Sequence, residues 1–160
     1  MIAFTSYSIG ETEQYILPLL AMKLREKGFT LTANFSQAIY PDTQALNEIR
    51  YANLFIGLIT KSGPAFKTKR VYQEFQQAIN QQKPSILLIE NTVSVAPWIR
   101  DYPNTVRFDR RFLNPAIEEV KNKIKASQNS GIQQNDNNAA WILGGVAALG
   151  LLAWLASDEK

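Results

Sequence analysis

The feature that most constrains this chain is a pair of short apolar runs separated by an amphipathic stretch. The first run is LFIGLIT at 54–60 and the second is SILLI at 85–89, and neither contains a charged residue. Such runs are typical of strands buried on both faces of a parallel sheet. Between them, apolar residues recur at helical spacing, at Val71, Phe75, Ala78 and Ile79. This order predicts a strand, a helix with one apolar face and a second strand, joined as a right-handed parallel unit.

The remainder of residues 1–125 repeats the alternation of strand and helix. Further strands are expected at 2–4, 29–33 and 105–108. Further helices are expected at 11–27, at 45–52 and from Asn114 onward. We therefore predict an α/β fold with a flavodoxin-like, doubly wound parallel five-stranded sheet, forming one domain over residues 1–125.

The composition restricts the chemistry that this chain can carry out. The sequence contains no cysteine and no histidine. Disulfides, thiolate nucleophiles, imidazole acid–base catalysis and histidine metal sites are therefore excluded. The formal net charge of +3 is too small to predict binding to nucleic acid. Any reaction must rest on carboxylates, hydroxyls, lysine, arginine and backbone groups, and we expect neither a metal nor a cofactor.

Glu74 is the most informative single residue in the predicted central unit. On a helical wheel it lies about 60° from Val71, at the border of the apolar face, and it follows a loop that contains Gly63 and Pro64. One interpretation is a catalytic carboxylate beside a pocket. The other is a surface glutamate that complements the helix dipole and pairs with Lys67 or Arg70. In that helix, Tyr72 is expected to be exposed to solvent.

Polar residues follow the first predicted strand, at the position where parallel sheets bind ligands. Ser6, Tyr7 and Ser8, followed by Gly10, are expected to form a turn at the carboxyl end of this strand. In open α/β sheets, ligands bind outside the carboxyl ends of the strands. These three side chains are therefore candidates for the wall of a binding site.

The last 35 residues differ in character from the domain. Residues 126–138 are rich in Asn and Gln and predict a flexible polar linker. Residues 139–156 contain no charge, and a helix of that length is about 27 Å long, close to the thickness of a bilayer core. Trp141 and Trp154 lie near its two ends, as interfacial anchors do. We predict a single-pass transmembrane tail anchor with a short polar tail at 157–160 and the domain in the cytoplasm. The alternatives are a helix buried in an oligomer and a helix at the membrane surface.

Small residues recur along one track of this predicted membrane helix. Ala140, Gly144 and Ala148 are spaced four residues apart. Such a track allows two helices to approach closely in lipid. It predicts that the chain forms a homo-oligomer.

Three stretches, in order, resemble motifs of a known family. They are FTSYS at 4–8, ALNEIRYANLFIGLIT at 45–60, and VYQEF at 71–75 followed by Ala78, Lys83 and Pro84. In this order and spacing they resemble the Toll/interleukin-1 receptor (TIR) domains and the related nucleoside 2-deoxyribosyltransferase-like fold. The resemblance covers roughly residues 1–125.

The resemblance implies an activity and a site. Catalytic TIR domains cleave NAD, which is a substrate and not a cofactor, and their conserved glutamate holds the ribose and stabilises positive charge as nicotinamide departs. By this resemblance Glu74 is the catalytic residue. The implied substrate-binding residues are Ser6, Tyr7, Ser8, Lys61 and Ser62. The implied function is that of a membrane-anchored effector that cleaves the N-glycosidic bond of NAD in prokaryotic anti-phage defence.

Two other functions are compatible with the same residues. In the first, the domain is a non-catalytic TIR signalling scaffold that assembles at the membrane. In the second, it is a nucleoside deoxyribosyltransferase-like enzyme that uses the same glutamate as a nucleophile. Both enzymatic reactions pass through an oxocarbenium-like state, which a nearby carboxylate stabilises.

Overall fold

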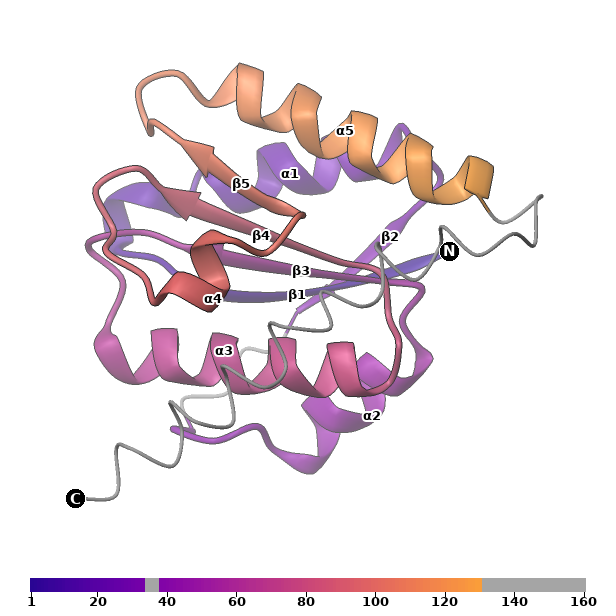
Figure 1. Ribbon diagram of the computed structural model, residues 1–160, viewed down its shortest axis with the longest axis horizontal. Coiled ribbons are helices and arrows are strands. Elements are labelled where there is room, and N and C mark those ends of the chain that lie inside the picture. Colours follow the sequence, from indigo (N-terminus) through magenta and orange to yellow (C-terminus); the bar gives the residue numbers. More distant parts are fainter. Residues whose placement is uncertain (34–37, 131–160) are drawn as a thin grey trace.

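The computed structural model describes residues 1–33 and 38–130 and places them in a five-stranded sheet covered by helices (Figure 1). The strands are β1 (Ile2–Ser8), β2 (Thr30–Ala33), β3 (Leu54–Ile59), β4 (Ser85–Glu90) and β5 (Thr105–Phe108). The helices are the 3-10 turn η1 (Glu11–Glu13), α1 (Ile16–Arg25), α2 (Thr43–Tyr51), α3 (Ala65–Asn80), α4 (Pro97–Arg100) and α5 (Leu113–Ser130). All strands are parallel, in the order β2-β1-β3-β4-β5. The predicted flavodoxin-like, doubly wound sheet is therefore confirmed.

Each face of the sheet buries its own apolar core. Helices α1 and α5 cover one face, and α2 and α3 cover the other (Figure 1). Alternate residues of a strand point to opposite faces, so Phe55 packs toward α3 while Ile56 packs toward α1 and α5. Because β3 and β4 are buried on both faces along their whole length, their sequences are apolar runs without alternation.

The first strand is longer than predicted. Ser6, Tyr7 and Ser8 belong to β1 and pair with Gly57, Leu58 and Ile59 of β3, so the expected turn at these residues was wrong. Strand β3 supplies the backbone hydrogen bonds to this end of β1, whereas β2 pairs only with residues 2–5. The pairing with β3 outweighs the weak strand preference of serine, so β1 extends to Ser8.

The helices also differ in detail from the prediction. The helix expected at 11–27 begins only at Ile16, after η1, because Pro18 is tolerated in the first turn of a helix but not further inside it. Helix α4, a single turn opened by Pro97, is not among the predicted helices. Helix α5 continues to Ser130, five residues into the predicted linker.

The predicted membrane anchor at 139–156, with its track of small residues, lies outside the described residues. Among the residues that the structure does describe, no helix is both long and apolar enough to cross a bilayer.

Candidate active site at the carboxyl edge of the sheet

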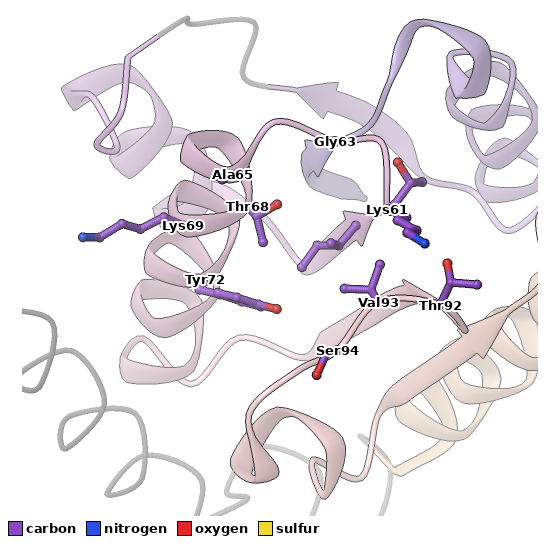
Figure 2. A pocket seen from close by; sticks show the side chains of 11 residues that line it. Lys61, Gly63, Ala65, Thr68, Lys69, Tyr72, Thr92, Val93 and Ser94 are labelled. Atoms are coloured by element: carbon purple, nitrogen blue, oxygen red, sulfur yellow. The ribbon is translucent and has the colours of Figure 1, made fainter.

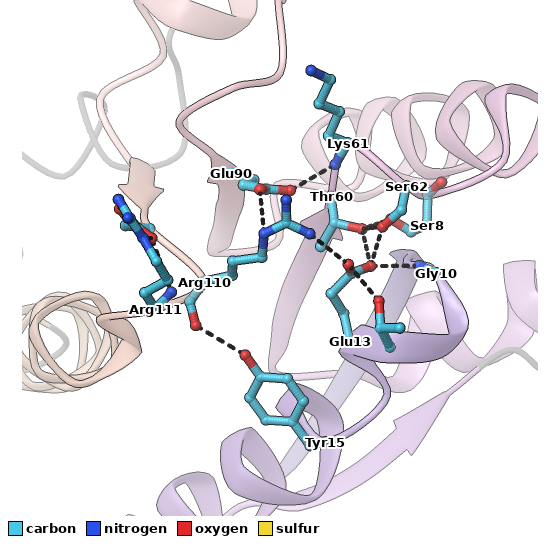
Figure 3. A network of polar contacts seen from close by, with 12 residues as sticks. Ser8, Gly10, Glu13, Tyr15, Thr60, Lys61, Ser62, Glu90, Arg110 and Arg111 are labelled. Carbon is cyan, nitrogen blue, oxygen red and sulfur yellow. Dashed lines mark hydrogen bonds and ion pairs between the residues drawn. The ribbon is translucent and has the colours of Figure 1, made fainter.

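The order of the strands reverses between β1 and β3, and ligands of doubly wound sheets bind at the carboxyl ends of such strands. In this protein that position is filled by a network of polar contacts centred on Glu13 (Figure 3). The network joins the segments that follow β1, β3, β4 and β5. The geometry of this network determines which side chains at the carboxyl edge can still contact a ligand.

Glu13 is 1% exposed and accepts five hydrogen bonds. Its Oε2 accepts from the backbone N–H of Gly10 at 2.8 Å, from Thr60 Oγ1 at 3.0 Å and from Ser62 Oγ. Its Oε1 accepts from Thr12 Oγ1 at 3.0 Å and from Arg110 Nη1 at 3.2 Å. Donors from three separate segments, after β1, β3 and β5, therefore converge on one carboxylate.

These contacts keep Glu13 ionised. Burial acts to raise the pKa of its carboxyl, but the hydrogen bonds from Ser62, Gly10, Thr60 and Thr12 together lower the pKa to about 2. A carboxylate with such a low pKa and with its lone pairs occupied is a weak base and a weak nucleophile. The contacts of Glu13 tie the loops at this edge together, and they make its carboxylate poorly suited to act as a base or a nucleophile.

Arg110 extends the network to the next strand. Its guanidinium lies 3.2 Å from Glu13 and 3.4 Å from Glu90, the last residue of β4. The other oxygen of Glu90 accepts the backbone N–H of Lys61 at 2.8 Å, and Tyr15 Oη donates to the Arg110 carbonyl at 2.9 Å. The loops at the carboxyl edge are thus held together by two buried carboxylates and one arginine.

A cavity of about 460 Å³ opens beside this network, between the start of α3 and the loop after β4 (Figure 2). Its size falls within the range of small-molecule sites. It is lined by Ile59, Thr60, Lys61, Gly63, Ala65, Thr68, Lys69, Tyr72, Thr92, Val93 and Ser94. Tyr72 is 8% exposed, so the expectation that it is solvated was wrong. The loop after β4 and the ring of Trp98, 5.9 Å from its own, cover it.

Glu74 lies on the other flank of α3 and does not line this cavity. Its side chain is 0% exposed, and its Oε1 lies 3.8 Å from Nε of Arg70, which is 1% exposed. Arg70 also donates to the carbonyl of Ala38, in the segment before α2, at 3.3 Å. The predicted pairing with Arg70 is present, but the expectation of a half-exposed position was wrong. Helix α3 is covered by the sheet, by α2 and by the segment at Ala38, so a residue at the border of its apolar stripe is still buried.

The structure does not bring the other predicted site residues into one pocket. Ser6 is fully buried, and its hydroxyl has no hydrogen-bond partner among the described residues. Tyr7 is partly buried against the core under α1 and α5, and this burial raises the pKa of its hydroxyl, opposed by the charge of Arg70. Ser8 Oγ lies 2.8 Å from Thr68 Oγ1. Lys61 lines the cavity and Ser62 belongs to the Glu13 network.

Sequence reasoning missed Glu13, Glu90 and Arg110. Glu90 could have been found, because it ends an apolar run at the edge where parallel sheets bind ligands. Glu13 could also have been found, because it follows Gly10 at the spacing of a capping box. No local pattern indicates Arg110, because its partners lie 97 and 20 residues away in the sequence.

Comparisons with known proteins identify the fold. No family model matches the chain, and no curated protein matches it. A solved structure, the CMP N-glycosidase BcmB of Clostridium botulinum, is similar to it with a TM-score of 0.51 and 17% sequence identity. The match covers 76% of this chain and 99% of the other. At this identity the likeness shows a shared α/β fold.

Proposed function

We propose that this protein cleaves the N-glycosidic bond of a nucleoside-type substrate, with Glu74 as the carboxylate that stabilises the transition state. The observation that carries the proposal is the Arg70–Glu74 pair, which is buried on both sides. Removing two charges from water costs more than their attraction commonly returns, so a packed apolar pair would serve the fold at least as well. A buried ion pair in a sheet-covering helix therefore favours a functional role.

The fold supports the same class of reaction. The similar structure is described as a CMP N-glycosidase, and the resemblance to TIR domains and deoxyribosyltransferases concerns cleavage of the same type of bond. In this reaction the bond from C1′ to the base nitrogen breaks, and its electron pair leaves with the base. Positive charge develops on the sugar, and a negative group close to it lowers the barrier. Water, or a second free base, then adds to C1′, and the proton that it loses passes to the departed base or to the solvent.

The position of Glu74 sets a condition on this reaction. A substrate can contact its carboxylate only if the contacts of Arg70 with Glu74 and with the Ala38 carbonyl are broken. The TIR resemblance favours NAD as the substrate, and the glycosidase fold equally favours a nucleoside monophosphate. From the same resemblance we propose a role in prokaryotic anti-phage defence. From the uncharged run at 139–156 and its track of small residues we propose that the protein acts there as a membrane-anchored oligomer.

The test is base release by the full-length chain. NAD, CMP, the other nucleoside monophosphates and deoxynucleosides are incubated with it, and free base is separated by chromatography. The wild type and Glu118→Gln, a matched change at a position whose side chain is 58% exposed, should release base at the same rate. Glu74→Gln should not. Equal release by Glu74→Gln would remove Glu74 from the site.

A second function is favoured by one observation. The complete burial of Glu74 suits a scaffold in which the Arg70–Glu74 pair fixes the segment at Ala38 against α3. In that case no substrate is turned over by any variant, and Arg70→Met and Glu74→Gln alter assembly of the full-length chain. Crosslinking of the chain in membranes, run beside the base-release assay, separates the two functions.

A further inference from the structure

The positive charge of this protein is concentrated at the end opposite to the candidate site. Helices α1 and α5 both end at the amino edge of the sheet, beside the N-terminus (Figure 1). The segments 23–27 and 118–125 carry six basic and three acidic residues. They are Lys23, Arg25, Lys27, Lys121, Lys123 and Lys125, with Glu26, Glu118 and Glu119. The rest of the chain contains 11 basic and 11 acidic residues, so the net charge of +3 comes from these two segments. We call them the basic end.

Contacts within the basic end show that its parts are adjacent. The terminal amine of Met1 donates to the carbonyl of Gly28, just after α1, at 3.2 Å. The hydrogen bond from Lys121 is the main reason that the pKa of Glu118 on α5 is lowered, and the charge of Lys23 on α1 lowers it further, as does that of Lys125. Lys123 Nζ donates to the carbonyl of Pro103, which precedes β5, at 3.1 Å. The two segments and the terminal amine therefore form one surface.

Half of these cations are not neutralised locally. Lys23, Lys121 and Lys123 pair with the three glutamates at 2.9, 2.7 and 3.7 Å. Within the described part of the chain, Arg25, Lys27 and Lys125 have no carboxylate at ion-pair distance. Complementing the helix dipole needs charge only in the last turn, and Lys27 lies beyond the last residue of α1.

The chain leaves the described domain at this same end. Helix α5 ends at Ser130, and eight residues, 131–138, separate it from the uncharged run at 139–156 that is predicted to enter the membrane. The flexible linker that the sequence predicts there would have a root-mean-square span of roughly 16 Å. Electrostatic attraction to a charged surface extends about 8–10 Å at physiological salt. The predicted anchor would therefore hold the basic end within reach of the lipid headgroups.

We propose that the basic end docks on anionic lipid headgroups next to the predicted anchor. Each lysine or arginine at an anionic surface strengthens its attachment about fivefold. The docked domain presents the amino edge of its sheet to the membrane. The carboxyl edge, with the cavity and the Glu13 network, then faces away from the lipid and stays open to dissolved substrates.

The absence of cysteine in the sequence makes a direct test possible. Met22→Cys places a single thiol directly beside the basic end, at a side chain that is 49% exposed, and Phe112→Cys places one at the opposite edge, where the side chain is 68% exposed. Each full-length variant is mixed with vesicles of phosphatidylcholine alone, or of phosphatidylcholine with phosphatidylglycerol. The rate of labelling by an uncharged polymer-linked maleimide is then measured.

Docking predicts that anionic vesicles slow the labelling of Met22→Cys by at least about fivefold relative to neutral vesicles. High salt, or the added changes Lys27→Glu and Lys125→Glu, should abolish the difference, while Phe112→Cys labels equally in all cases. Equal labelling of Met22→Cys in both vesicles would overturn the proposal. Protection by an oligoribonucleotide but not by vesicles would overturn it in favour of a nucleic-acid surface. If the full-length chain does not sediment with the vesicles, the predicted anchor is refuted. The comparison of labelling rates in neutral and anionic vesicles still tests whether the basic end binds anionic lipid.

Discussion

Glu13 and Glu74 are both buried carboxylates, Glu13 at the carboxyl edge of the sheet and Glu74 in the second half of α3, and their surroundings differ. Glu13 is met by backbone and hydroxyl donors at hydrogen-bond distance, from segments far apart in the sequence. Glu74 faces an arginine from its own helix at 3.8 Å, beyond hydrogen-bond distance. The first arrangement stabilises the ionised form and ties loops together. Under the proposed function, the second arrangement holds the charge that stabilises the transition state. Burial alone therefore does not distinguish these two carboxylates, whereas the contacts described around each of them do.

The largest effect is expected from Glu74→Gln. Loss of one preorganised charge at the transition state typically lowers the rate 10²–10³-fold, or roughly 3–4 kcal/mol of barrier. The buried charge of Arg70 is also left uncompensated, which costs about 3–5 kcal/mol of stability. Base release and urea denaturation measure the two effects. If Glu74→Gln were as stable as the wild type, Arg70 and Glu74 would not form a buried ion pair in solution.

The double variant Arg70→Met/Glu74→Leu separates stability from chemistry. Replacing a buried ion pair with apolar residues of similar size is often neutral or stabilising by about 1–4 kcal/mol. The urea midpoint should therefore return to the wild-type value or exceed it, while base release stays at the level of Glu74→Gln. Recovery of activity in this variant would contradict a role for Glu74 in the reaction.

Glu13→Gln should reduce stability without a direct effect on the reaction, and the loss should depend on pH. The pKa of Glu13 falls from 4.5 to about 2 on folding, which corresponds to about 3 kcal/mol of stability. Because the folded-state pKa is the lower one, this contribution is fully present above pH 4.5 and is lost as the pH falls toward 2. Denaturation of the wild type and Glu13→Gln at several pH values should show the difference shrinking over that window. A constant difference would exclude the ionised carboxylate as its source.

A smaller effect on stability is expected from Gly63→Ala, in the loop after β3 that also contains Ser62. A Cβ at Gly63 would collide with the backbone carbonyl of Ser8, so the loop must shift at a cost of about 1–3 kcal/mol. Thermal denaturation measures this cost, with Lys61→Ala in the same loop as the control. If Gly63→Ala and Lys61→Ala have the same melting temperature, the loop is less tightly held than its contacts in the Glu13 network imply.

The sheet could be predicted from the sequence because its signals are local. Apolar runs at β3 and β4 and the spacing of Val71, Phe75 and Ala78 each reflect neighbours in one segment. The surroundings of the two carboxylates are not local. Glu74 is buried by α2 and by Ala38, which the helical wheel of α3 does not represent. Glu13 depends on Thr60, Ser62 and Arg110, and only the assembled strands bring those donors to it.

The contact between Arg110 and Glu13 has a consequence for how the chain is made. A ribosome adds roughly 5–20 residues per second, and these partners are 97 residues apart. For roughly 5–20 seconds after Glu13 emerges, its strongest charged donor has not been synthesised. Strand β1, which pairs with β3 across about 50 residues, likewise waits for its inner neighbour. The amino-terminal strand thus spends roughly 2.5–10 seconds without its partner β3, and an unpaired strand edge exposes a nascent chain to aggregation and to chaperone binding.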